Sequence, residues 1–167
     1  YLDMLWNENA APEADLPPGY SVRSFQDGDT PLLTKVQNDA FTGSWGFCPN
    51  TDEQIEYRTH MPNTSKAGIL FLLEGDRPAG YCWTVKVPGD NGPRGIIGMI
   101  GVVPDYRGKG VSRHVLHAGM RYLRSIGLVE VGLEVDGNND AAIRLYTSTG
   151  FKKMGERHWF ELDLPGI

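Results

Sequence analysis

The sequence has few cysteines and no long hydrophobic run. Only Cys48 and Cys82 occur among the 167 residues, and they lack metal-binding spacing, so a disulfide scaffold and a zinc site are both disfavoured. We interpret both as reduced thiols that serve packing rather than chemistry. No apolar segment approaches the roughly 20 residues that cross a bilayer, and the polar N-terminus does not resemble a signal peptide. These absences predict a cytoplasmic protein that binds no metal and no membrane.

Positive charge is also scarce. The chain has 16 Lys and Arg against 21 Asp and Glu, a formal net charge of -5. Because an acidic surface repels polyanions, nucleic acid is disfavoured as a partner. The length, with 40% hydrophobic residues, suits one compact domain with a full core.

One segment combines an apolar strand, a proline and a basic, glycine-rich loop that opens a helix. Ile96–Val103 is apolar, Pro104 ends it, and residues 107–112 read Arg-Gly-Lys-Gly-Val-Ser before a helical apolar period that continues to Gly127. The first N–H groups of a helix have no intrahelical acceptor and carry partial positive charge, so this loop predicts a pyrophosphate site. An ordinary strand-to-helix turn is the alternative. The spacing matches neither Gly-x-x-x-x-Gly-Lys-Ser/Thr nor Gly-x-Gly-x-x-Gly.

This loop resembles the pyrophosphate loop of the GNAT superfamily of acyl-CoA-dependent N-acyltransferases, Gln/Arg-x-x-Gly-x-Gly/Ala. Ser112 stands where the family has glycine or alanine. A second match to the family follows downstream in the same order. It comprises Leu133-Glu134-Val135, Asn139-Asp140-Ala141-Ala142, Leu145-Tyr146 and Gly150-Phe151. The chain is similar to ribosomal-protein alanine N-acetyltransferases and to the domains of mycothiol synthase.

The resemblance implies an α/β (α+β) GNAT fold. Its mixed central sheet would have about seven strands, splayed at the acyl-CoA site and flanked by about four helices. The implied activity is transfer of an acetyl group from acetyl-CoA to a primary amine, by direct attack in a ternary complex and without a metal. The acceptor would be a small-molecule or peptide amine. The alternative is a non-catalytic acyl-CoA-binding domain, either a sensor or the silent half of a tandem acetyltransferase.

The resemblance also assigns the residues that bind acetyl-CoA. A strand edge would contact the pantetheine arm, the glycine loop would hold the pyrophosphate, and the residues after the second strand would contact the arm again. The assigned positions are Ile100, Gly101, Val102, Arg107, Gly108, Lys109, Gly110, Val111, Ser112, Arg113, Asn139, Ala142 and Arg144.

Two side chains are candidates for proton transfer. An amine is protonated at neutral pH, so a base must remove a proton before attack, and the departing thiolate benefits from a nearby acid. The resemblance assigns the base to Glu134 and the acid to Tyr146. Partial burial in a cleft would suit Glu134 for this role, whereas the alternative has it facing solvent; Tyr146 is alternatively a core residue. Further candidates are His60 and Glu53 for the base, and Trp45, Phe47 and Trp83 for the acceptor wall.

Hydrophobic periods and turn residues predict the remaining organisation. Residues 1–19 are expected to be an N-terminal extension or linker, possibly the end of a preceding domain, and residues 20–167 the acetyltransferase domain. Tyr1–Trp6 loosely resembles Phe160–Leu164, so a tandem partner domain is one interpretation, but an N-terminal extension that pairs with the sheet is favoured, and a homodimer is a further alternative. Strands are expected at 20–25, 68–73, 78–87, 96–103, 129–135, 151–154 and 157–164, and helices at 30–41, 51–61 and 110–127. Residues 51–54 predict a capping box that opens the second of these helices, and Asn139 is expected to be a helix cap as well as a contact of the cofactor arm.

Overall fold

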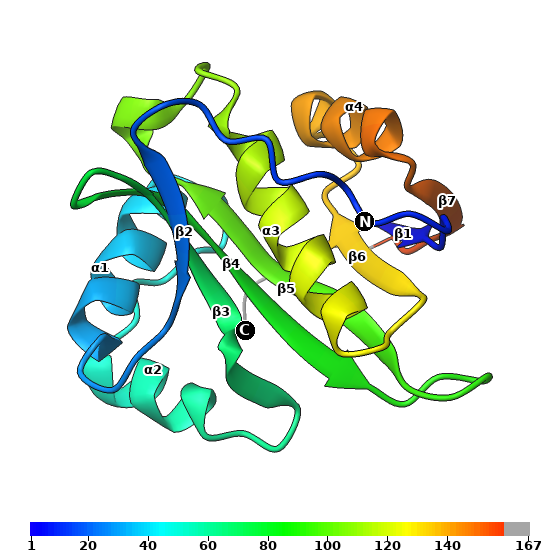
Figure 1. Ribbon diagram of the computed structural model, residues 1–167, viewed down its shortest axis with the longest axis horizontal. Coiled ribbons are helices and arrows are strands. Elements are labelled where there is room, and N and C mark those ends of the chain that lie inside the picture. Colours follow the sequence, from blue (N-terminus) through cyan, green and yellow to red (C-terminus); the bar gives the residue numbers. More distant parts are fainter. Residues whose placement is uncertain (159–167) are drawn as a thin grey trace, which may run out of the picture.

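Seven strands form one mixed sheet in the computed structural model, which describes residues 1–158 (Figure 1). The strand order is β2-β3-β4-β5-β6-β1-β7, and β5 and β6 are parallel neighbours while the other pairs are antiparallel. The strands are β1 Leu2–Trp6, β2 Tyr20–Ser24, β3 Thr64–Glu74, β4 Arg77–Val87, β5 Arg94–Val102, β6 Val131–Val135 and β7 Lys152–Glu156. The helices are α1 Thr30–Phe41, α2 Asp52–Thr59, α3 Val111–Ser125 and α4 Asp140–Thr149, with a short 3-10 turn η1 at Pro104–Tyr106. The expected GNAT sheet and its four flanking helices are confirmed.

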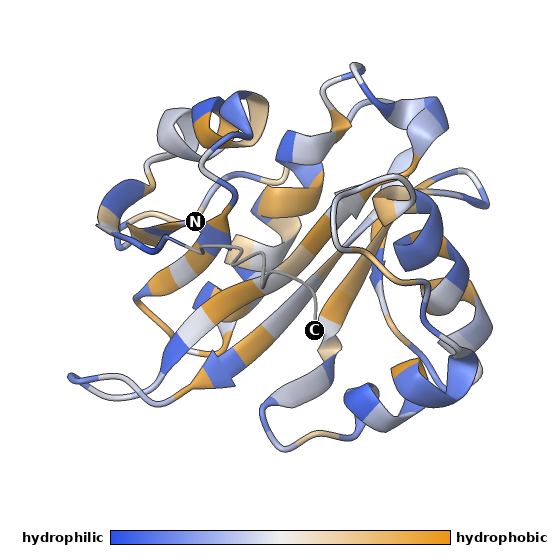
Figure 2. Ribbon diagram, turned by 180° about the vertical axis from the view of Figure 1, so that it is seen from behind, coloured by the Kyte–Doolittle hydropathy of each residue, from blue (hydrophilic) through white to orange (hydrophobic). Residues whose placement is uncertain are grey.

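Helices cover the two faces of the sheet unequally. Helices α3 and α4 pack on one face, where the larger core includes Met120 and Phe151. Helices α1 and α2 pack on the other face over Phe71 and Trp83. Seen from behind, α1 and α2 lie over the β2–β5 side, and no described helix covers β6, β1 and β7 on this face (Figure 2). Among residues 1–158, this part of the sheet therefore has no helix on that face, and it lies beside the strands that carry the sequence motifs.

Local sequence signals placed the helix ends correctly. Thr51 and Gln54 form the expected capping box, with both reciprocal hydrogen bonds present at the start of α2. Pro31 occupies the first turn of α1, where its missing N–H costs nothing. Gly75 has a φ of 56° in the turn between β3 and β4, a conformation that glycine adopts without strain.

Several strand boundaries differ from the prediction. β3 begins at Thr64 instead of residue 68, because a register irregularity between Thr64 and Ile69 lets the strand continue in pairing with β4. β5 begins at Arg94, and β6 begins at Val131 because Val129, 60% exposed, has no buried face to fill. β7 extends to Glu156, two residues past the expected end of the first arm of the C-terminal hairpin. The second expected arm lies largely outside the described residues.

The first strand of the chain lies between β6 and β7. Asp3 is opposite Glu134 in the antiparallel β1–β6 pair, and β1 also pairs with β7 along its other edge. Met4 and Trp6 point into the core and are 4% and 1% exposed. Residues 2–6 are thus part of the sheet.

The segment that follows β1 crosses over α3 to reach β2 at the opposite edge of the sheet (Figure 1). Arg124 donates hydrogen bonds to the carbonyl oxygens of Asn9 and Glu8 at 3.0 and 2.8 Å. Arg121 donates to the carbonyl oxygen of Glu13 at 3.1 Å. These bonds fix residues 7–19 against α3 although the segment has no secondary structure of its own.

The two cysteines are free and lie in different environments. Burial raises the pKa of the Cys82 thiol to about 12, as expected for a packing residue. Cys48 is exposed, so its interpretation as a packing residue is wrong. No helix within residues 1–158 has both the length and the hydropathy of a membrane span.

Candidate active site

The candidate site is a cleft where the parallel strands β5 and β6 separate. Their pairing covers only Gly95–Ile97 with Val131–Leu133, although β5 continues to Val102. Beyond that point no strand among residues 1–158 pairs with this edge of β5, so its backbone groups are available to a ligand. The resulting β5–β6 cleft has a volume of about 430 Å³. Its lining residues include Phe41, Trp45, Phe47, Met99, Ile100, Glu134, Asn139, Ala142 and Tyr146.

The glycine loop leads to a helix start whose backbone N–H groups are not capped by a side chain. Gly108 and Gly110 have φ values of 73° and 75°, so both use the left-handed region that favours glycine. Gly110 is the N-cap of α3, and no side chain accepts a hydrogen bond from the first turn. The first turn of α3 therefore offers free donors and partial positive charge, the arrangement that binds a phosphate group.

The arginines near this loop make protein contacts rather than pointing freely into solvent. Arg107 donates to the carbonyl oxygen of Ala40 at 2.8 Å and so ties the loop to α1. Arg113 donates to the Ser148 hydroxyl at 2.8 Å and links α3 to α4. Lys109 lies 5.2 Å from the ring centre of Tyr106. The arginines hold the loop between its neighbouring helices, while the backbone supplies the anion-binding donors.

Helix α4 presents its N-terminus and one buried tyrosine to the cleft. The Asn139 side chain accepts a hydrogen bond from the Ala142 N–H at 3.1 Å, which confirms its expected role as helix cap. Tyr146 is 7% exposed and its ring packs against Phe151. Burial, with a smaller contribution from Cys82, raises the pKa of the Tyr146 hydroxyl to about 12. This hydroxyl keeps its proton at neutral pH, and Tyr146 is among the residues that line the cleft.

Glu134 lies on the exposed face of β6 rather than in the buried position that would strengthen a base. Its side chain is 53% exposed and forms an ion pair with Arg157. Arg157 also donates to both carboxylate oxygens of Asp3, at 2.7 and 3.3 Å. The expectation of partial burial is therefore wrong. The Glu134 carboxylate is instead paired with Arg157, whose guanidinium also bonds to Asp3.

Other expected positions are spread around the cleft. Gly101 and Val102 lie on the end of β5, where Gly101 allows close packing of Ala40 from α1. Arg144 is on the exposed side of α4. Trp45 lines the cleft and is 86% exposed, whereas Trp83 is 3% exposed beneath the Arg58 guanidinium and belongs to the core. The alternative bases His60 and Glu53 are on α2 and are not among the residues that line the cleft.

A second depression shares Glu134 with the cleft and lies on the open face of the sheet. We call it the charged hollow. It has a volume of about 520 Å³, and Leu133 and Glu134 line both depressions. Its charged residues are Asp3, Arg94, Glu134 and Arg157, and its apolar residues include Leu5, Val85, Val87, Ile96 and Met154. Glu134 thus stands at the boundary between the cleft and the hollow.

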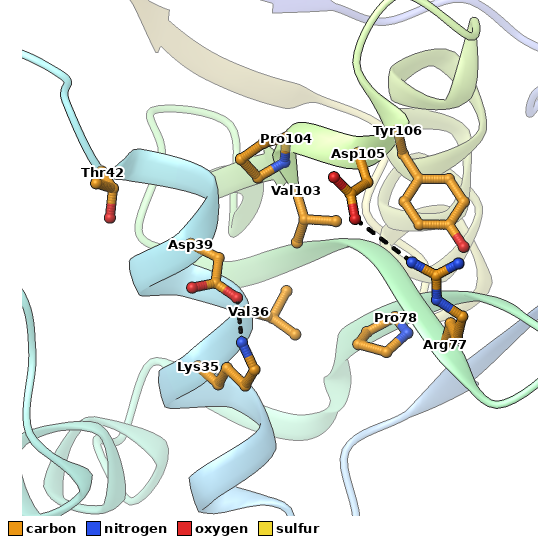
Figure 3. A pocket seen from close by; sticks show the side chains of 10 residues that line it. All are labelled: Lys35, Val36, Asp39, Thr42, Arg77, Pro78, Val103, Pro104, Asp105 and Tyr106. Atoms are coloured by element: carbon orange, nitrogen blue, oxygen red, sulfur yellow. Dashed lines mark hydrogen bonds and ion pairs between the residues drawn. The ribbon is translucent and has the colours of Figure 1, made fainter.

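A third depression, of about 450 Å³, lies between α1 and η1 (Figure 3). Its two cations are already paired with neighbouring carboxylates: Lys35 with Asp39 at 2.5 Å and Arg77 with Asp105 at 3.4 Å. The carboxylates neutralise both cations, and the lining does not include Glu134 or Tyr146. This depression is not connected with the candidate chemistry.

Three residues of the charged hollow were not identified from the sequence: Asp3, Arg94 and Arg157. Asp3 alternates with the buried Met4, a pattern that places it on the polar face of a strand. Nothing local indicates that this strand pairs with β6, however, and Arg157 reaches Glu134 only after β7 is placed. The signal for this group is therefore tertiary.

The chain matches the model of the Acetyltransferase (GNAT) family over residues 30–151. The chain belongs to this family. Its sequence is 35% identical over 151 residues to the mycothiol acetyltransferase of Geodermatophilus obscurus, covering 85% of this chain and 47% of the relative. The chain spans about half the length of the curated relatives that it matches. The family resemblance drawn from the two motifs is confirmed.

Solved structures of GNAT proteins have the same fold. A GCN5-related N-acetyltransferase from Sphaerobacter thermophilus superposes with a TM-score of 0.77 at 26% identity, covering 92% of this chain and 48% of that one. The ribosomal-protein-S18-alanine N-acetyltransferase of Escherichia coli superposes with a TM-score of 0.62 at 24% identity, covering 78% and 76%. The second likeness concerns the fold alone.

Proposed function

We propose that this chain is an N-acetyltransferase that transfers an acetyl group from acetyl-CoA to a primary amine by direct attack in a ternary complex. The observation that carries the proposal is the composition of the β5–β6 cleft. The cleft has a free strand edge, and both Glu134 and Tyr146 line it. The uncapped N-terminus of α3 follows directly after β5 and its loop. When bound, acetyl-CoA supplies an activated acetyl thioester.

The residues of the chain divide the work of binding. The N–H groups at the start of α3, with Gly108 and Gly110, would hold the pyrophosphate, and Lys109 would add positive charge nearby. The free edge of β5 at Ile100 would hydrogen-bond the pantetheine arm. This use of backbone donors is compatible with the negative net charge of the chain, because an acidic protein can bind an anionic ligand through backbone donors and a few local cations.

Proton transfer would be divided between two residues that line the cleft, one on β6 and one on α4. Glu134 would accept the amine proton, directly or through water, since it faces both the cleft and the charged hollow. Tyr146 would donate its proton to the leaving thiolate, because the raised pKa of about 12 keeps the hydroxyl protonated at neutral pH. The acceptor would be a small-molecule or peptide amine that approaches from the open face of the sheet.

The test is release of the CoA thiol from acetyl-CoA in the presence of an amine panel, with mass spectrometry of the products. Because the curated relatives are named mycothiol acetyltransferases, amines related to mycothiol belong in that panel. Amine-dependent thiol release together with an N-acetylated product supports the proposal. Tight binding of acetyl-CoA without acetylation of any amine would instead support a non-catalytic acyl-CoA-binding domain.

A further inference from the structure

Arg94 is a half-buried arginine without a carboxylate partner. It lines the charged hollow from the start of β5. Its Nε atom is buried and has no hydrogen-bond partner, and its guanidinium forms no ion pair within residues 1–158. No carboxylate among residues 1–158 pairs with the charge of this half-buried guanidinium, and such a charge favours an anionic partner. Because Arg94 lines the same depression as Glu134, a ligand in the hollow could supply that partner.

The opposite end of the hollow carries a net negative charge. Asp3 and Glu134 face each other across the β1–β6 pair, and Arg157 bonds to both. Two carboxylates and one guanidinium leave one negative charge in this group. The Arg157 hydrogen bond lowers the pKa of the Asp3 carboxyl, and the charge of Arg94 contributes to a smaller extent. An arriving ammonium group would be attracted to this end.

Apolar side chains line the charged hollow between Arg94 and the Asp3–Glu134 end. Ile96 is opposite Gly132 in the β5–β6 pair, which places Arg94 two residues before that point and Glu134 two residues after it. Four residues of strand correspond to about 13 Å between the Cα atoms, a separation that the two side chains shorten. Val85 and Leu5 contribute apolar surface to the same hollow. A ligand of several bonds in length would span it.

We propose that the charged hollow binds the acceptor, and that this acceptor is zwitterionic: it carries a carboxylate or phosphate for Arg94 in addition to the amine that meets Glu134. The inference rests on the proposed acetyl transfer and adds the class of its acceptor. An anionic group would pair with the positive charge of Arg94, and the amine would lie beside the carboxylate at the boundary with the cleft. The charges of the ligand and of the hollow would then be complementary.

The experiment compares amines that differ in the anionic group alone. The carboxylate arm uses γ-aminobutyrate and ε-aminohexanoate against their neutral carboxamides, and the phosphate arm uses aminoethyl phosphate against ethanolamine. For the wild-type protein, kcat/KM is expected to be at least about tenfold higher for the anionic member of one arm, the discrimination that one charge-assisted contact provides. The arm with the larger ratio identifies the anion.

Variants of Arg94 test whether this residue is responsible. Arg94→Gln is expected to bring the ratio close to one through a loss of kcat/KM for the anionic members, and Arg94→Lys is expected to retain part of the preference. Arg77→Gln removes a positive charge at the other end of β4 and is the matched control. Removing an unpaired cation should not lower the melting temperature, so loss of folding is not the expected cause of any change.

Each outcome decides the inference. Equal kcat/KM values for both members of every pair, or an equal loss for both in Arg94→Gln, would overturn it. Calorimetric titration of the same pairs into the CoA-bound protein, which has no acetyl group to transfer, gives a readout without turnover. If no amine is acetylated but the anionic members bind at least about tenfold more tightly through Arg94, acetyl transfer is refuted while the binding inference is supported. Equal binding of both members would overturn the inference independently of activity.

Discussion

The β5–β6 cleft and the charged hollow meet at Glu134 but are built from different kinds of groups. The cleft has the free edge of β5 and one buried tyrosine, and the uncapped start of α3 follows after the loop beyond β5. The hollow has ionised side chains from β1, β5, β6 and the residue that follows β7. Backbone donors are the same whatever the side chains are, whereas ionised side chains change with one substitution. In the function proposed above, the cleft would bind acetyl-CoA and the hollow would select the acceptor.

The largest effect is expected when the backbone N–H groups at the start of α3 are blocked. Gly110→Asp places a carboxylate at the N-cap of α3, where it would accept hydrogen bonds from the first-turn N–H groups and repel phosphate. The wild-type protein should gain about 2.7 kcal/mol of stability at a hundredfold excess of acetyl-CoA over its Kd. Thermal melting should show no such gain for the variant.

Gly28→Asp is the matched control, because Gly28 also has a positive φ of 95° but lies in the loop before α1. It carries the same backbone strain and the same added charge. Its melting shift with acetyl-CoA should equal that of the wild type. A retained shift in Gly110→Asp would show that the start of α3 does not bind the pyrophosphate.

The next effect concerns the acid on the cleft side. Tyr146→Phe removes the hydroxyl, and kcat should fall by about 10²–10⁴-fold if this group protonates the thiolate. The free energy of unfolding should change by no more than about 0.5–1.5 kcal/mol, the worth of one hydrogen bond. Tyr57→Phe, on the exposed face of α2, is the control for removal of a hydroxyl. A kcat within about threefold of wild type, only about 0.65 kcal/mol of barrier, would leave Tyr146 as a packing residue.

A smaller effect is expected at the boundary between the two regions. Glu134→Gln keeps the shape of the side chain and removes the base, so kcat/KM for the amine should fall by about 10²-fold at neutral pH. The loss should shrink as rising pH deprotonates the amine without help. Binding of acetyl-CoA, measured by the melting shift, should be unchanged. A variant whose activity has the same pH dependence as the wild type would transfer the role of base to another group.

The smallest expected effect concerns the stability of the protein at acidic and at alkaline pH. Tyr146 and Cys82 both have pKa values raised to about 12, so the unfolded chain ionises first as pH rises, and stability is lost between about pH 9 and 12. The pKa of Asp3 is lowered by Arg157, so its contribution is present above its ordinary value of 3.8 and is lost as pH falls below that value.

Melting curves at acidic, neutral and alkaline pH separate the two regions. Tyr146→Phe should reduce the alkaline loss, by up to about 1.4 kcal/mol per pH unit, and leave the acid loss unchanged. Arg157→Gln should reduce the acid loss and leave the alkaline loss unchanged. Identical pH profiles for both variants and the wild type would contradict the assignment of these groups.

The sequence predicted the cleft better than the hollow. The capping box at Thr51, the cap at Asn139 and the glycines of the loop are local features, and the structure has each of them where it was expected. The Arg107 contact with Ala40 and the Arg157 contact with Glu134 join residues far apart in the chain. No spacing or period encodes such contacts, because they depend on which strands become neighbours.

The position of β1 has a consequence for how the chain reaches its native state. The partners of Leu2–Trp6 lie well over one hundred positions further along the chain, in β6 and β7. At about 5–20 residues per second of synthesis, β1 would wait on the order of ten seconds before either partner leaves the ribosome. During that time β1 lacks the two strands with which it pairs in the folded sheet. Closure of the sheet, and with it the ion pairs that hold Glu134, is therefore among the last steps of folding.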